Sequence, residues 1–302
     1  MSISRLEWKH FFSLLKVLIL LLTVRYLIQY ALDYDIPKLI NQSSAEYLAV
    51  AFTLLLVNYF LQIRLLMIFS RGKLTFMDSF YVEFYTMLMN TSIMSSFFSV
   101  QKIAFLNQRI KNLRESMQLF IKPMAFGVCI RMAFILVSGV GAYQGIAAAI
   151  IASAGLAGFF LIMVYGPKRR YVERVTGLPA KKTIQVGAII SSEISLISIA
   201  FFCILASLTD SDLHVFNVVF SEGVGYMSGF FSPLPSGLGV REFVLTELNS
   251  VMGISKEVAF AAAILYRFVI FADQVLAGVL LILSTKAFKR LRKPGVKGMV
   301  RS

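Results

Sequence analysis

The sequence predicts an all-α integral membrane protein with about six transmembrane helices and two re-entrant helical hairpins of opposite direction, which together could form an inverted repeat. The first observation is composition: of 302 residues, 58% are hydrophobic and only 15% are charged, and the mean hydropathy is +0.76. In soluble domains about a quarter of the residues are charged. The second observation is that basic residues collect in alternate loops. The third is that two apolar stretches lie between loops of the same predicted side.

Six apolar runs are long enough to cross a bilayer, which takes about twenty helical residues. The first run contains Arg25 and Gln29 and lacks a small-residue cleavage site. Because further spans follow it, we interpret this run as a retained helix and not as a signal peptide. The predicted spans are residues 11–30, 47–69, 121–140, 144–165, 183–208 and 257–285.

The distribution of charge predicts the topology. Of the 30 Lys and Arg residues, 23 lie in the five segments 1–9, 64–78, 102–122, 168–182 and 286–302, and the alternate loops carry acids such as Asp33 and Asp210. This positive-inside pattern places both termini in the cytoplasm. The net charge of +14 therefore indicates a membrane orientation and not a nucleic-acid partner.

The same pattern divides the chain into a single polytopic membrane domain, residues 1–285, and a basic cytoplasmic tail, residues 286–302. The tail carries seven basic residues and no acid. We expect it to be attracted to the anionic lipids of the inner leaflet.

Two remaining apolar stretches cannot be simple spans under this topology. Residues 80–105 lie between two basic loops. Residues 215–251 follow an acidic loop that contains Asp210 and Asp212, and they precede a last span that must begin outside. We therefore predict a re-entrant hairpin in each half of the chain. The sequence SSFFS at 95–99 matches SGFFS at 228–232, which favours an internal repeat of the kind found in transporters. The alternative is a chance match in a chain with 27 Phe.

The second hairpin contains the sequence SPLPSGLGVRE at 232–242, whose prolines and glycines interrupt any helix. Irregular backbone at membrane depth requires burial in protein or a wet cavity. Gly239 precedes a helical run at 240–252, whose first N–H groups would attract an anion, and Arg241 adds a positive charge there. The alternative reading is a surface turn between two spans.

Residues 235–242, PSGLGVRE, followed by Tyr266-Arg267, resemble the membrane region of lysylphosphatidylglycerol synthases and their flippase-like relatives. In that family the usual form is Pro-Gly-Gly-x-Gly-x-x-Glu, followed further along by Tyr-Arg. The resemblance implies a helical bundle with re-entrant hairpins that moves or holds an anionic or modified lipid between leaflets. It also implies the inner membrane of a bacterium as the location.

The sequence departs from that family in two places. Ser236 stands where the family usually has Gly, and the first half lacks a matching Pro-Gly and Arg motif. Either Lys102 replaces the first-half arginine or half of the usual site is missing. The complete synthases also carry a soluble aminoacyl-transfer domain, and only 17 residues follow Thr285 here. We therefore expect a stand-alone member without that domain.

Ionisable groups inside spans cost about 3 kcal/mol each on insertion scales, so each needs a partner or a function. Arg131 and Glu193 lie at similar depth and could pair as a structural bridge or line a transport path. Glu222 and Glu242 are candidate counter-ions for the arginines of the motif. The predicted lipid-phosphate site is Gly237, Gly239, Arg241, Glu242 and Arg267, with Glu222, Asp273, Arg131 and Glu193 as counter-ions or a polar relay.

These residues favour a lipid carrier, or flippase-like protein, for an anionic or lipid-linked head group. One alternative is a non-transporting accessory subunit for a glycosyltransferase or polysaccharide-assembly partner. The other is a membrane transferase that uses Glu222 and Glu242 as acid and base. The sequence has no nucleotide-binding loop and no Ser-His-Asp set, and Cys129, Cys203 and the two histidines form no metal motif. We expect no enzymatic activity, cofactor or metal, and a lipid or a membrane protein as partner.

Overall fold

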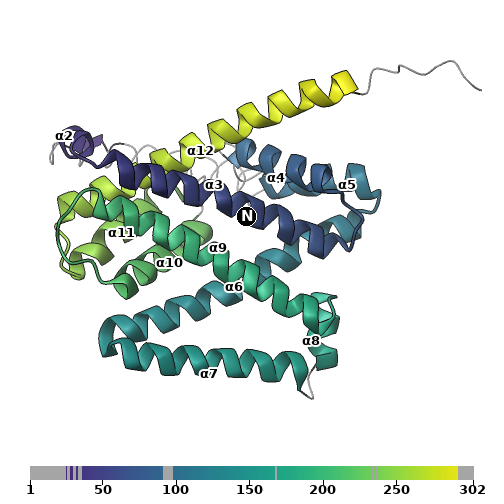
Figure 1. The fold of residues 1–302 in the computed structure, drawn as a ribbon, viewed down its shortest axis with the longest axis horizontal. Coiled ribbons are helices and arrows are strands. Elements are labelled where there is room, and N and C mark those ends of the chain that lie inside the picture. The colour runs from purple at the N-terminus through teal and green to yellow at the C-terminus, as the bar shows by residue number, and fades with distance from the viewer. Residues whose placement is uncertain are drawn as a thin grey trace, which may run out of the picture.

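The protein is described by a computed structural model covering residues 25, 28, 29, 32, 36–90, 98–166, 169–232, 234 and 237–291, and within these residues the secondary structure is helical (Figure 1). The helices are α2 Ile36–Asn41, α3 Ala45–Ser70, α4 Phe76–Asn90, α5 Phe98–Ile110, α6 Leu113–Gln144, α7 Ile146–Tyr165, α8 Arg169–Thr176, α9 Ala180–Ala206, α10 Val215–Phe231, α11 Val240–Val251 and α12 Lys256–Leu291.

Four helices are long and apolar enough to cross a membrane: α3, α6, α9 and the part of α12 up to Leu280. They confirm four of the six predicted spans and identify a multi-pass membrane protein. The predicted span at 144–165 forms α7, in which Ile146–Gly158 is a shorter apolar helix. The first, at 11–30, lies outside the described residues except for Arg25, Ile28 and Gln29, so the total of six stays a prediction.

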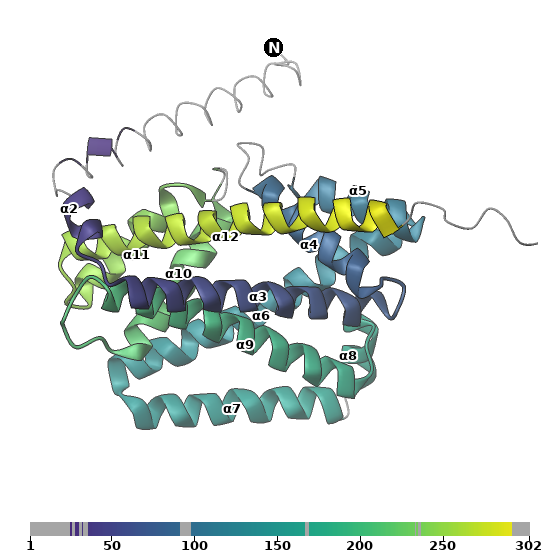
Figure 2. The same cartoon turned by 45° about the horizontal axis from the view of Figure 1, so that its top comes forward.

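The two predicted hairpins are formed by pairs of short helices. α4 and α5 have 15 and 13 residues, and α10 and α11 have 17 and 12. A helix of 12 residues is about 18 Å long, which is well short of the hydrocarbon thickness of about 30 Å. The two pairs approach the bundle from opposite ends (Figure 2). Their re-entrant position in a bilayer stays a prediction, and residues 91–97, between α4 and α5, lie outside the described part.

The packing of the helices repeats itself in the two halves of the chain. α3 packs antiparallel against α9 at the centre of the bundle (Figure 2). The last helix of each half packs against the hairpin of the other half: α6 packs on α10, and α12 packs on α4. The order α3–α6 thus corresponds to α9–α12, as an internal repeat requires.

The sequence match that favoured a repeat does not join equivalent places in this fold. Phe98 and Ser99 begin α5, whereas Phe230 and Phe231 end α10. Equivalent positions would lie in α5 and α11, or in α4 and α10. The match is the chance similarity that the abundance of Phe in this chain allows.

Small residues bring the second hairpin close to α6. A Cβ built on Gly141 would lie 2.6 Å from the ring of Phe216, and one built on Gly223 would lie 2.6 Å from Ile135. Glycine removes the side chain at both positions, so that α6 and α10 approach closely, as is common between helices in membranes. These contacts place the second half of α6 beside the first half of α10.

The connection between α10 and α11 is the broken helix that the sequence predicted. Gly237 and Gly239 have φ of 65° and 80°, in the left-handed region that disfavours a Cβ. The backbone of Gly237 also contacts the backbone of Gly229, so closely that a Cβ at 237 would overlap it. Gly237 is therefore required both by its φ and by the close approach. Three residues of the motif lie outside the described part of the chain: Pro233, Pro235 and Ser236.

Replacing Gly237 with alanine should lower the stability of the folded protein by about 2 kcal/mol or more, because the new Cβ meets the backbone of Gly229 in a left-handed conformation. Thermal unfolding of the detergent-solubilised protein measures this effect. Gly127→Ala is the matched control, since Gly127 lies within α6 and a Cβ there would meet nothing within 4 Å. Equal melting temperatures for the two variants would show that the turn does not need a glycine.

Candidate functional site

α11 begins directly after Gly239, as the sequence predicted, and its first turn is closed by Glu242. The backbone N–H of Gly239 donates a hydrogen bond of 2.6 Å to Oε2 of Glu242. Glycine has no side chain to cap the helix, so the carboxylate at the third helical position supplies the negative charge that a helix N-terminus favours. Glu242 therefore has a structural task at the position where the sequence suggested a bound anion.

The same carboxylate joins α11 to α12. Nε of Arg267 donates a hydrogen bond of 2.6 Å to Oε1 of Glu242, and Nη2 of Arg267 forms an ion pair with the same oxygen. The Glu242 side chain is 4% exposed, whereas that of Arg267 is 27% exposed. Glu242 is thus the counter-ion of Arg267, and the arginine keeps a face that a ligand could reach.

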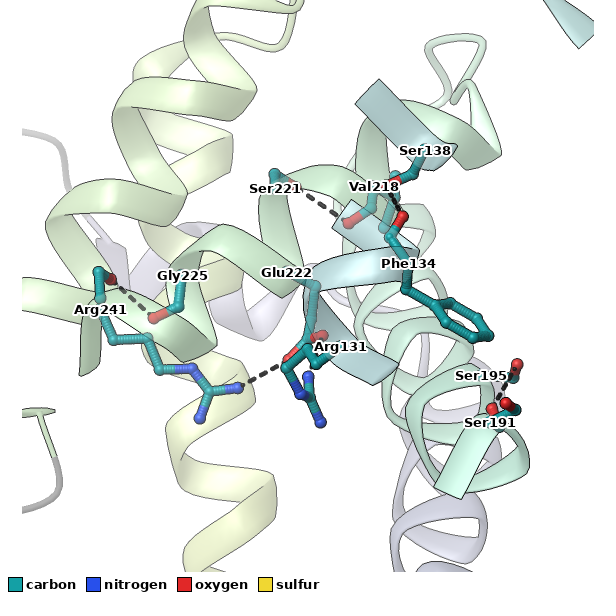
Figure 3. Close-up of polar contacts among 11 residues, drawn as sticks. Arg131, Phe134, Ser138, Ser191, Ser195, Val218, Ser221, Glu222, Gly225 and Arg241 are labelled. Atoms are coloured by element: carbon teal, nitrogen blue, oxygen red, sulfur yellow. Dashed lines mark hydrogen bonds and ion pairs between the residues drawn. The ribbon is translucent and has the colours of Figure 1, made fainter. Parts of the chain in front are cut away.

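The second acid of the site, Glu222, lies between two arginines from different helices (Figure 3). Nη1 of Arg131, on α6, lies 3.1 Å from Oε2 of Glu222, and Nη2 of Arg241, on α11, lies 3.2 Å from Oε1. The Glu222 side chain has no exposed surface, and those of Arg131 and Arg241 are 6% and 15% exposed. The carboxylate therefore joins α6, α10 and α11 through one buried network, and the expected pairing of Glu222 with Arg241 is confirmed.

Two tyrosines cover the faces of these arginines. The guanidinium carbon of Arg131 lies 3.7 Å from the ring centroid of Tyr226, and that of Arg241 lies 4.7 Å from the ring centroid of Tyr266. Such cation–π contacts stabilise a guanidinium group where water is excluded. The contacts also show why the motif at 235–242 and the Tyr266-Arg267 pair lie together in the fold. Tyr266 contacts Arg241, and the neighbouring Arg267 contacts Glu242.

The charges of this network do not cancel. Among the side chains that form these ion pairs, three arginines meet two glutamates, so Arg131, Glu222, Arg241, Glu242 and Arg267 together sum to a net charge of +1. Nε of Arg241 is buried and has no hydrogen-bond partner among the described residues. We call these five residues the arginine cluster. It offers a surplus positive charge and a hydrogen-bond donor, Nε of Arg241, from which an anionic group could accept a hydrogen bond.

Glu193 forms no ion pair with Arg131 among the described residues, although the two side chains lie close enough to interact electrostatically. Oε1 of Glu193 accepts a hydrogen bond of 3.1 Å from Gln62, across the contact between α3 and α9. Arg131 points to Glu222 because α6 packs on α10. The sequence indicated that Arg131 and Glu193 lie at a similar depth in the membrane. It did not indicate the direction in which either side chain points from its helix.

Asp273 is likewise not joined to the cluster by any ion pair within the described part. Its side chain is fully buried in α12, and neither carboxylate oxygen has a hydrogen-bond partner among the described residues. Burial of a polar group without a partner is costly. Asp273 is therefore expected to destabilise the packing around α12.

The first hairpin contains an ion pair that the sequence did not single out. Nζ of Lys102, on α5, lies 2.8 and 2.9 Å from the two oxygens of Glu83, on α4, and the two side chains are 15% and 6% exposed. Glu83 and Lys102 are separated by 19 residues, as are Glu222 and Arg241. Lys102 thus holds the place in the first hairpin that Arg241 holds in the second. The equal spacing was the signal in the sequence that could have identified Glu83.

Among the described residues, no group of three or more His, Cys, Asp or Glu side chains could hold a metal ion. The acids of the arginine cluster are each engaged by a guanidinium group. The chemistry that the cluster offers is the binding of an anion.

Comparison with known families matches residues 125–278 to the family described as the lysylphosphatidylglycerol synthase TM region. The matched range contains the helices from α7 to α11 completely, together with most of α6 and much of α12. It includes every residue of the arginine cluster, whereas Glu83 and Lys102 precede it. A search of curated proteins returned no match.

Glu222→Gln should destabilise the protein by about 3–5 kcal/mol, because it leaves the buried guanidinium groups of Arg131 and Arg241 without their shared anion. The melting temperature in detergent measures the loss. Glu247→Gln is the control, since Glu247 pairs with Lys256 at the surface and should contribute less than about 1 kcal/mol. Similar effects of the two substitutions would contradict the structural role of Glu222.

Asp273→Asn should raise the melting temperature, because it replaces a buried acid for which the described residues offer no hydrogen-bond donor with a group that never carries a charge. Asp78→Asn provides the contrast and should lower it, since Asp78 pairs with Arg109 and accepts hydrogen bonds from Thr75. A marked fall for Asp273→Asn would show that its carboxylate is held by a charge partner.

Proposed function

We propose that this chain, which belongs to the lysylphosphatidylglycerol synthase transmembrane-region family, is a lipid carrier that moves an anionic or lipid-linked head group across the bilayer. The family relationship indicates a membrane protein of lipid or envelope metabolism. The flippase-like role is our proposal, and its main support is the arginine cluster, a buried network with a net charge of +1.

A lipid phosphodiester carries one negative charge, which would balance the surplus of the arginine cluster. Arg241 and Arg267 are the cluster residues best placed to bind it. Their side chains are 15% and 27% exposed, and Nε of Arg241 has no partner among the described residues. Guanidinium groups bind phosphate oxygens through charge-assisted hydrogen bonds, which are stronger than neutral ones. Glu222 and Glu242 would position the two arginines and limit the affinity for the anion.

The irregular backbone at Gly237 and Gly239 would give the head group access to this cluster, since an unbroken helix would present only side chains. The first hairpin, with Glu83 and Lys102, would form a second polar station that opens toward the opposite end of the bundle. Alternation between the two hairpins would then pass the head group across the membrane.

This proposal makes the protein a carrier and not an enzyme. Glu222 and Glu242 would be poor acids or bases, because each is engaged by arginine. We further propose that the end of the bundle with Arg71, Lys111 and α8 faces the cytoplasm, as the positive-inside pattern predicts, and that the membrane is the inner membrane of a bacterium.

Arg241→Ala should reduce lipid movement at least about tenfold while the bundle stays folded, because Glu222 keeps Arg131 as a partner. The measurement is the flux of fluorescent phosphatidylglycerol in proteoliposomes, read from the protection of the inner-leaflet label against an added quencher. Phosphatidylcholine with the same label tests whether the head group matters.

Arg109→Ala is the matched control, since Arg109 is half exposed and pairs with Asp78 at the surface. If the wild type moves the lipid and Arg241→Ala moves it at the same rate, the assignment of the site would be contradicted. No flux by folded wild type would favour the accessory-subunit role, and a chemically altered head group recovered from the liposomes would favour a transferase.

A further inference from the structure

Two adjoining hollows lie at the basic end of the bundle, where α3, α6 and α8 meet. One has a volume of about 270 Å³, and its polar lining includes Arg71, Arg114, Lys122 and Thr176. The other has a volume of about 420 Å³ and an almost entirely apolar lining that includes Met117. The two hollows share three lining residues on α6, namely Arg114, Gln118 and Lys122. Together they form one site with a cationic part and an apolar part.

The cations of the polar hollow converge on Gly177. Nζ of Lys122 and Nη2 of Arg71 lie 2.8 and 2.9 Å from the point where a Cβ of Gly177 would stand. Neither side chain has an ion pair with an acid among the described residues. Two like charges brought this close repel one another unless an anion lies between them. The absence of a side chain at Gly177, whose φ is 69°, leaves the space in which they meet.

The acid in the lining of the polar hollow does not neutralise these cations. Glu115 pairs with Lys73 through a contact of 2.6 Å, so that its charge is already balanced by a residue outside the hollow. Arg114 adds a third cation at the border with the apolar hollow. The polar hollow is therefore strongly positive.

The apolar hollow continues from this charge along the surface of α6. Leu113, Met117 and Ile121 recur at intervals of four residues, lie on one face of the helix and are 57%, 42% and 46% exposed. A free anion such as phosphate would use only the polar hollow. A phospholipid would use both, with its phosphate on the cations and an acyl chain along these three side chains.

We propose that these hollows form a second lipid site, which binds an anionic phospholipid of the leaflet at the basic end of the bundle. The site is separate from the arginine cluster, since Lys122 precedes Arg131 by nine residues of α6, or about 13 Å. Its assignment does not depend on transport by the cluster. It would hold an anionic lipid at the membrane surface whether or not the protein moves lipids.

The test is a titration of the purified protein with phosphatidylglycerol, followed by native mass spectrometry, which counts bound lipids. The variant Arg71→Gln/Lys122→Gln removes the two converging charges. The control Lys181→Gln/Lys182→Gln removes two exposed charges at the start of α9, near the same end of the bundle, that line neither hollow. We expect the first variant to weaken the binding of one phosphatidylglycerol by roughly tenfold or more and the control to leave it unchanged.

Equal weakening by both variants, or by neither, would overturn the proposal. The variant Arg71→Lys/Lys122→Arg keeps both charges and should bind as wild type does, which separates loss of the site from loss of the fold. Displacement of the lipid by inorganic phosphate at equal concentration would show a site for a soluble anion and overturn the lipid assignment. Arg241→Ala should leave this bound lipid in place, so that failure of the arginine cluster and failure of the second site give different results.

Discussion

The carboxylate of Glu222 lies between two guanidinium groups in the apolar interior of the bundle, and the arrangement of the second half depends on this contact. A buried charge without a partner costs several kcal/mol, so the acid holds α6 and α11 beside α10. Glu242 does the same for the first turn of α11 and for α12. The two acids thereby keep three arginines inside a membrane protein, and the positive charge that they leave unbalanced is the one that our proposal assigns to a lipid phosphate.

The two hairpins use one plan with different chemistry. Each joins its helices by an acid and a base 19 residues apart, Glu83 with Lys102 and Glu222 with Arg241. The lysine is a point charge that pairs with Glu83 in the described part of the chain, whereas the arginine is a planar fork that contacts Glu222 and stacks on Tyr266. The first pair is electrically balanced and the second group is not. This difference gives a physical reason to place the stronger anion site in the second half.

Much of this fold follows from the sequence, because hydropathy determines spans and the buried cations require acids. The apolar runs predicted α3, α6, α9 and α12, and the glycines predicted the start of α11. The partner of Arg131 could not be predicted, since residue depth gives the height of a side chain in the membrane but not the direction in which it points. That direction is set by the packing of α6 on α10, to which Gly141 and Gly223 contribute. Glu83 was missed although its 19-residue spacing from Lys102 equals that of Glu222 from Arg241, because this spacing gained a meaning only once the ion pairs were known.

The claim that Arg241 binds a lipid phosphate is tested most directly by solid-state NMR. Dipolar recoupling between phosphorus and 15N-labelled arginine, in bilayers that contain phosphatidylglycerol, detects a guanidinium nitrogen within about 4 Å of a phosphate, the separation expected for a direct hydrogen bond. Comparison of wild type with Arg241→Lys isolates Arg241 from the other arginines. Our account predicts a phosphorus-dependent signal in wild type that falls in the variant. An identical signal in both proteins, or no signal in wild type, would contradict it.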